Sequence, residues 1–146
     1  MGIESVYEQL SSYAKEKTPI SGAADSFAHL AKWARKKVEY FLVLTLDGAQ
    51  KPIRVHEITK GLVNRTLVHP REVFRPAIRD NAVSIVLAHN HPSNKLAPSA
   101  EDHEITKRLT KAGQIIGISV LDHLILGAYR YYSFSESGLM TTGVEL

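Results

Sequence analysis

The sequence predicts an α/β fold in which one mixed β-sheet is flanked by helices. Helical and strand patterns alternate along the chain in an order that suits helices packed on a sheet. The run "AVSIVLAH", residues 82–89, is almost entirely apolar, which is typical of a strand covered on both faces. The segment from Ser99 to about Ile116 has the apolar spacing of an amphipathic helix. At 146 residues, the chain has the length of a single domain.

Residues 1–37 are predicted to form a helical lead-in to a domain that spans residues 38–146. A first helix is indicated by apolar residues at helical spacing, namely Ile3, Val6, Tyr7, Leu10 and Tyr13. The stretch "TPISG", residues 18–22, interrupts this pattern. We expect a second helix from about Ala24 to Lys37.

The remaining elements follow from local patterns. Two β-rich runs around "DGAQKP" predict a hairpin over residues 38–58, and "GLVNRTLVHP", residues 61–70, predicts a third strand. "PREVFRPAIRDN", residues 70–81, predicts a short helix with Pro76 in its first turns or at a kink. Gly113 or Gly117 would end the long helix. "ISVLDHLILG" and "YRYYSFSES" predict two closing strands.

The composition narrows the possible functions. The apolar fraction of 44% and the charged fraction of 23% are those of a globular protein, and no apolar run approaches a membrane span. The N-terminus does not resemble a secretory signal, so we expect a cytoplasmic protein without membrane contact. There is no cysteine, so any metal must be held by histidine and carboxylate. The net charge of +3 is compatible with nucleic-acid contact but does not predict it.

Two histidines stand where the buried strand ends. Side chains two residues apart point to the same face of a strand, so His89 and His91 continue the row of Val83, Ile85 and Leu87. Both imidazoles would therefore emerge side by side at the C-terminal end of the strand. This placement suits two ligands of one ion.

The helix that follows supplies a third ligand. Asp102 opens the stripe of residues that faces the core, and a carboxylate in that position needs a compensating partner such as a metal cation. The alternative is that Asp102 belongs to a capping box with Ser99. Three protein ligands would leave one position of a tetrahedral zinc ion open, which is typical of a catalytic site. Such a zinc ion lowers the pKa of its water to about 7.

The hydrolytic reaction also needs a group that transfers protons. Ile53, Val55 and Glu57 are predicted to share one face of the hairpin, so Glu57 is the candidate, unless the strand has simply reached solvent at that point. Glu72 is the rival candidate, although its place in the first turn of a helix already suits the helix dipole.

Taken together, Glu57, His89-x-His91-Pro92 and Ser99-x-x-Asp102 resemble the JAMM motif of the JAB/MPN metalloproteases. The segments "LVHPREVFRPAIRDNAVSIVLAHNHPSNKLAPSAED" and "LDHLILG" are similar to the bacterial RadC-like branch, and the resemblance extends from about Val38 to Ser135. One departure is Asn94, which stands where RadC-like proteins usually have glycine. Asparagine in a left-handed turn would preserve the loop.

The resemblance implies a fold and a set of roles. The fold would be a sheet between helices, a three-layer sandwich similar to that of cytidine deaminases. His89, His91 and Asp102 would bind Zn²⁺, Glu57 would be the general acid/base, and Ser99 would donate a hydrogen bond to the developing oxyanion. The reaction would be hydrolysis of a peptide or isopeptide bond in a peptide or protein substrate.

Other functions compete with this interpretation. A DNA-repair-associated or DNA-binding role would use the basic residues of the predicted helices, namely Arg71, Arg75, Arg79, Arg35, Lys36, Lys37, Lys107, Arg108 and Lys111. A third alternative is a non-catalytic interaction module. The intact motif argues against this alternative, because such a module does not need a metal site with an open position. The letters "HNH" do not have the spacing of HNH nucleases, and a cytidine deaminase is excluded because its cysteine ligands are absent. The oligomeric state is not predicted by the sequence.

The remaining histidines and aromatic residues are predicted to be structural. His69 and His123 are interpreted as hydrogen-bonded residues instead of ligands. Trp33, Tyr131, Tyr132 and Phe134 are interpreted as packing residues instead of a platform for nucleic-acid bases.

Overall fold

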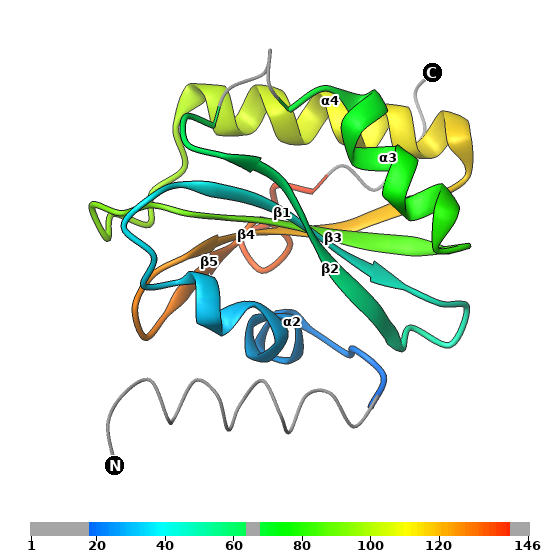
Figure 1. Ribbon diagram of the computed structural model, residues 1–146, viewed down its shortest axis with the longest axis horizontal. Coiled ribbons are helices and arrows are strands. Elements are labelled where there is room, and N and C mark those ends of the chain that lie inside the picture. Colours follow the sequence, from blue (N-terminus) through cyan, green and yellow to red (C-terminus); the bar gives the residue numbers. More distant parts are fainter. Residues whose placement is uncertain (1–17, 64–67, 141–146) are drawn as a thin grey trace.

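The computed structural model describes residues 18–63 and 68–140 and confirms the predicted fold class. Its five strands form one mixed sheet in the order β2-β1-β3-β4-β5. Helices α3 and α4 cover one face of this sheet and α2 covers the other (Figure 1). The elements are α2 Ala23–Leu30, the 3-10 turn Ala31–Trp33, β1 Tyr40–Leu46, β2 Pro52–Lys60, α3 Pro70–Arg79, β3 Ser84–Asn90, α4 Ala100–Ile116, β4 Ser119–Leu126 and β5 Tyr131–Ser133.

Strand β3 lies at the centre of the sheet and is covered on both faces, and the apolar run predicted that covering. All seven of its residues are buried, and it pairs antiparallel with β1 and parallel with β4. One core lies between the sheet and α2 and contains Val86 and Ala88, whereas the other lies beneath α3 and α4 and contains Ile85 and Leu87. The alternation of side chains along β3 therefore divides the molecule into its layers.

The long helix is fixed at both ends by its sequence. Ser99 is the N-cap of α4, and Gly117 follows the helix in a left-handed conformation with φ 91°. A residue at this C-terminal position avoids steric strain only if it lacks a Cβ atom, which explains the glycine. Of the two glycines predicted to end the helix, Gly117 is the one that does so.

Helix α3 is also close to the prediction. The ring of His69 accepts a hydrogen bond from the backbone N–H of Arg71 and caps the helix, and Pro70 occupies the first turn. Pro76 lies within the helix. The prediction that His69 is a hydrogen-bonded structural residue is confirmed.

Several predicted elements differ from the structure. The helix predicted from Ala24 to Lys37 ends at Leu30 and continues only as a 3-10 turn. The predicted strand over residues 61–70 was wrong for its described part, because Val63 donates its backbone N–H to the carboxylate of Glu39 instead of to a strand. The last strand has only three residues. The first predicted helix lies outside the described residues.

The hairpin β1–β2 is present as predicted, but it contains two irregularities of register. One lies at Ile53, which packs in the core beneath α3 and α4, whereas Val55 packs in the core beneath α2. The prediction that Ile53, Val55 and Glu57 share one face was therefore wrong. A β-bulge inserts one extra residue and turns the following side chains to the other face.

No helix within residues 18–63 and 68–140 combines the length and the apolar character needed to cross a membrane.

Candidate metal centre

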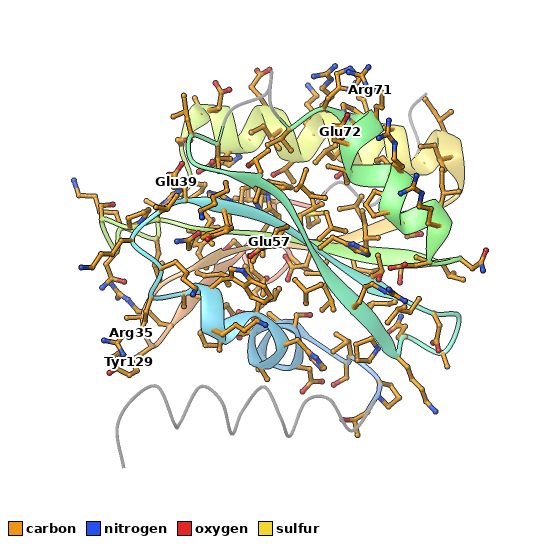
Figure 2. The ribbon with its side chains drawn as sticks, viewed as in Figure 1. Arg35, Glu39, Glu57, Arg71, Glu72 and Tyr129 are labelled. Atoms are coloured by element: carbon orange, nitrogen blue, oxygen red, sulfur yellow. The ribbon has the colours of Figure 1, made fainter. Side chains whose placement is uncertain are left out.

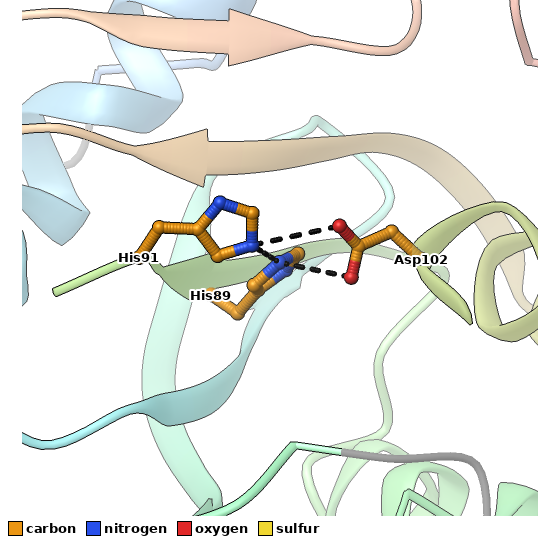
Figure 3. A group of neighbouring side chains, drawn as sticks. All are labelled: His89, His91 and Asp102. Atoms are coloured by element: carbon orange, nitrogen blue, oxygen red, sulfur yellow. Dashed lines mark hydrogen bonds and ion pairs between the residues drawn. The ribbon is translucent and has the colours of Figure 1, made fainter. Parts of the chain in front are cut away.

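Three side chains converge at the end of β3 where the strand enters its loop. The Nε2 atoms of His89 and His91 are 2.9 Å apart. Asp102 lies 3.2 Å from His89 Nε2 through Oδ1 and 3.5 Å from His91 Nε2 through Oδ2 (Figure 3). One ligand atom from each residue lies within 4.8 Å of the others, so the three could hold a metal ion.

The local fold explains why these groups meet. His89 is the penultimate residue of β3, and His91 directly follows the strand on the same side. Asp102 lies in the first turn of α4, which packs over that side of the sheet. The central strand and the start of its crossover helix therefore bring together residues from two separate elements.

Asp102 serves both of the roles that its position predicts. The capping box is present, because Asp102 donates its backbone N–H to Ser99 Oγ at 3.1 Å and accepts the N–H of Ser99 at 2.8 Å. The same carboxylate also faces both histidines. Capping and metal binding are thus compatible at this residue.

The electrostatics of the cluster favour an ionised Asp102. Burial alone would raise the pKa of this carboxyl, but hydrogen bonds and charge from His89, with a further hydrogen bond from His91, outweigh burial and hold the pKa well below its usual value. The hydrogen bond to Asp102 raises the pKa of His91, against the opposing effect of burial. A proton on His91 Nε2 therefore lies between His91 and Asp102, where a bound cation would lie.

We expect the affinity for zinc to fall as the pH decreases through the raised pKa of His91. Zinc requires His91 without its Nε2 proton, so protons compete with the metal from a higher pH than at a histidine of pKa 6.5. Asp102 stays ionised over this range because its pKa is lowered. A competition titration with a chromogenic chelator between about pH 5.5 and 8.5 should show a loss that approaches about tenfold per pH unit at the acidic end. A constant affinity over that range would contradict this expectation.

The loop between the ligands is held by its backbone. His91 Nδ1 lies 2.6 Å from the carbonyl oxygen of Lys95, which can only accept, so His91 donates. Asn94 has φ 62°, and its side-chain oxygen accepts the N–H of Ala128 at 3.1 Å. Asn94 therefore adopts the left-handed turn that was expected at this position, and it also joins this loop to the β4–β5 turn.

Behind the ligands lies His123 of β4, which is fully buried. Its Nε2 is 2.7 Å from His89 Nδ1, its Nδ1 is 2.5 Å from Thr106 Oγ1, and its ring stacks on Phe134. Burial and the neighbouring His89 hold the pKa of His123 well below its usual value. The prediction that His123 is a hydrogen-bonded residue is confirmed.

The structure does not bring Glu57 to this cluster. Glu57 pairs across the hairpin with Leu42, which belongs to the core beneath α2, and its carboxylate accepts a hydrogen bond from Trp33 Nε1 at 2.8 Å. Its side chain thus lies on the face of the sheet opposite to His89. The physical reason is the bulge at Ile53, which reverses the row on which the prediction depended.

Glu39 is a second carboxylate near the cluster, and it was not identified as a candidate from the sequence. It directly precedes β1, in the row of Phe41, and Phe41 pairs with His89. Continuing this antiparallel register by two residues places Glu39 opposite His91. Its charge contributes to the raised pKa of His91, and its Oε2 accepts the N–H of Val63 at 3.1 Å. Figure 2 shows Glu39 and Glu57 at separate places in the molecule. Residues 39, 41 and 43 alternate along the predicted strand, and this alternation is the sequence signal that could have identified Glu39.

Buried Asn90 ties the start of β1 to the end of β3. Its side-chain oxygen accepts the N–H of Tyr40 at 2.7 Å, and its amide nitrogen donates to the carbonyl oxygens of Lys36 and Val38. These hydrogen bonds hold the residues on both sides of Glu39, namely Val38 and Tyr40. They therefore fix the backbone of Glu39 close to the His89–His91–Asp102 cluster.

The other candidates are placed away from the cluster. Glu72 lies in the first turn of α3, as predicted, and pairs with Arg71 at 3.6 Å. Trp33 and Phe134 are buried, and Tyr131 packs against Phe27, so these aromatic residues serve packing as predicted.

Comparison with known proteins gives a consistent result. The sequence model of the family described as "RadC-like JAB domain" matches residues 20–139. A "UPF0758 protein" of Trichlorobacter lovleyi is 52% identical over 116 residues, which cover 80% of this chain and 50% of that protein. Similar proteins occur in Geobacter sulfurreducens, with 50% identity over 77% of this chain and 48% of the relative, and in Symbiobacterium thermophilum, with 49% identity over 75% and 47%. The chain spans about half the length of the curated relatives it matches.

Proposed function

Because this chain belongs to the RadC-like JAB domain family, we propose that it is a zinc-dependent hydrolase of the JAMM type that cleaves a peptide or isopeptide bond. The observation that carries the proposal is the convergence of His89, His91 and Asp102 on one point. Each histidine directs Nε2 toward that point while its Nδ1 is hydrogen-bonded elsewhere.

The residues present fit zinc. Two imidazole nitrogens and one carboxylate oxygen are ligands that zinc prefers in proteins, and both histidines have the outer hydrogen bonds that usually orient such ligands. A zinc ion held here would keep one coordination position open and would supply Lewis-acid activation of water for hydrolysis.

Glu39 is proposed as the general acid/base, in place of Glu57. Its Oε2 is held by the N–H of Val63, and no described residue forms a hydrogen bond with Oε1. Oε1 would accept a proton from the attacking water and deliver it to the nitrogen of the leaving amine, so that one proton is taken up and released in each cycle.

Ser99 is proposed to donate a hydrogen bond to the oxyanion that develops on the substrate carbonyl. Its Oγ accepts the N–H of Asp102, so its own hydroxyl proton is not used by the cap. The residue is exposed at the N-terminus of α4, where the helix dipole also favours negative charge.

The first experiment combines metal analysis with a search for substrate. The purified protein should contain about one zinc ion per chain, and it should cleave members of a library of peptides and isopeptide-linked lysine conjugates, with products detected by mass spectrometry. A chelator should remove both the metal and the activity, and added zinc should restore them. A folded protein unable to take up zinc would refute the proposal. Zinc binding without any cleavage would favour a non-catalytic interaction module.

A DNA-associated role is a second candidate. The arginines of α3 are exposed. Burial and the positive charges of Arg71 and Arg108 lower the pKa of His69, so basic residues of both α3 and α4 lie near His69. We expect the double substitution Arg71→Glu and Arg75→Glu to weaken binding of a fluorescent DNA duplex and to reduce its salt dependence. Lys51→Glu, in the hairpin turn, is the control. An absence of binding at low salt would exclude this role.

A further inference from the structure

A chain of hydrogen bonds joins two of the proposed metal ligands through the interior of the protein. It runs from the backbone carbonyl of Asp102 to Thr106 Oγ1 at 2.7 Å, from Thr106 to His123 Nδ1, and from His123 Nε2 to His89 Nδ1. The linking residues come from α4 and β4, and both are buried. The chain lies beneath the ligands, and neither Thr106 nor His123 belongs to the ligand group.

The direction of each bond follows from the chemistry of the groups. A carbonyl oxygen can only accept, so the single hydroxyl proton of Thr106 is donated to Asp102. Thr106 Oγ1 must then accept from His123, which places the proton of that ring on Nδ1. A neutral imidazole has one N–H, so His123 Nε2 accepts, and His89 donates from Nδ1. When His89 is neutral, its Nε2 is left with a lone pair that faces His91 and Asp102.

We infer that Thr106 and His123 are positioning residues that hold His89 in the tautomer able to bind zinc. The alternative tautomer has its proton on Nε2 and would donate it to Asp102 Oδ1, 3.2 Å away, in the place where the ion must bind. In neutral His89, the hydrogen-bonded chain disfavours that tautomer before the metal arrives. This inference rests on the proposed zinc site.

The two histidine ligands are oriented by different means. For His91 the partner is the backbone carbonyl of Lys95, which no side-chain substitution removes. For His89 the partner is a side chain, which in turn depends on Thr106. Of these two histidines, His89 is therefore the one whose tautomer a side-chain substitution at its hydrogen-bond partners can change.

The test replaces the hydroxyl of Thr106 by a methyl group of similar size. Thr106→Val should lower the affinity for zinc about 10- to 100-fold in a competition titration, because His123 Nδ1–H loses its acceptor. Thr106→Ser retains the hydroxyl and should restore the affinity to within about threefold. Thr110→Val is the matched control, because Thr110 is equally buried one turn further along α4 and donates only to the backbone carbonyl of Thr106. Its zinc affinity should equal that of the unmodified protein.

A second measurement separates orientation from stability. Long-range ¹⁵N–¹H spectra of the metal-free protein at mildly alkaline pH should show the Nδ1–H form of His89 in the unmodified protein and in Thr110→Val, and a mixture of tautomers in Thr106→Val. Equal zinc affinities of Thr106→Val and the unmodified protein, or equal losses in the two valine variants, would overturn the inference. If the unmodified protein itself binds no zinc, the proposed function fails as well, so the two failures are distinguishable.

Discussion

Substitution of Asp102 by asparagine is expected to abolish stoichiometric zinc binding while the protein stays folded. Asparagine retains an oxygen that can accept the N–H of Ser99, so the N-cap of α4 is preserved. It loses the negative charge that faces both histidines at 3.2 and 3.5 Å. A neutral amide is a poor ligand for zinc, so the affinity should fall by at least about 100-fold, more than is typical for the loss of an outer hydrogen bond.

Elemental analysis and a chelator titration measure this loss, and circular dichroism checks the fold. His89→Ala should have the same effect on zinc, because it removes a buried nitrogen ligand. Glu101→Gln is the control, since it neutralises the adjacent carboxylate in the same helical turn, which does not belong to the group of three candidate ligands. Full zinc occupancy in Asp102→Asn would contradict the assignment of Asp102 as a ligand.

Exchange of Glu39 for glutamine is expected to lower the rate of hydrolysis by about 10²- to 10⁴-fold with zinc still bound, because the amide cannot accept a proton. The amide oxygen of glutamine can still accept the N–H of Val63, so the position of the side chain is retained. Glu57→Gln is the matched control, because its amide oxygen can still accept the indole N–H of Trp33 on the opposite face of the sheet. Its rate should stay within a few-fold of the unmodified protein.

The comparison of these two variants decides which glutamate transfers the proton. The measurement is the turnover rate on one substrate from the library, together with the zinc content of each protein. A strong loss of rate in Glu57→Gln with an unaffected Glu39→Gln would restore Glu57 to the role predicted from the sequence. Equal rates in all three proteins would remove both residues from the reaction.

The three residues that could hold a metal were predictable because local rules place them. His89 and His91 continue the alternation of a strand that is buried throughout, and Asp102 occupies the inward face of the first helical turn. The capping box fixed Asp102 at the start of the helix, and the same position turned out to face both histidines. Each of these inferences required only neighbours along the chain.

The glutamate could not be predicted in the same way. The alternation of side chains shows which residues share a face, but it does not show which face of the sheet that is. A single bulge at Ile53 moved Val55 and Glu57 away from Ile53 and toward α2. The predicted strand over residues 61–70 failed for a related reason, because strand propensity does not guarantee a partner, and Val63 found the carboxylate of Glu39 instead.

The sequence by itself determined the mixed sheet with its packed helices, the strand buried on both faces and the three residues that could hold a metal, because periodicity and capping act over a few residues. The tertiary structure alone decided which carboxylate stands beside the cluster and how His89 is oriented from behind. The pairing of β1 with β3 brings the charge of Glu39 near His91, and Thr106 and His123 reach His89 from α4 and β4. These contacts depend on strand register and on the packing of a helix against a sheet, which join residues far apart in the chain and leave no pattern in any short stretch of it.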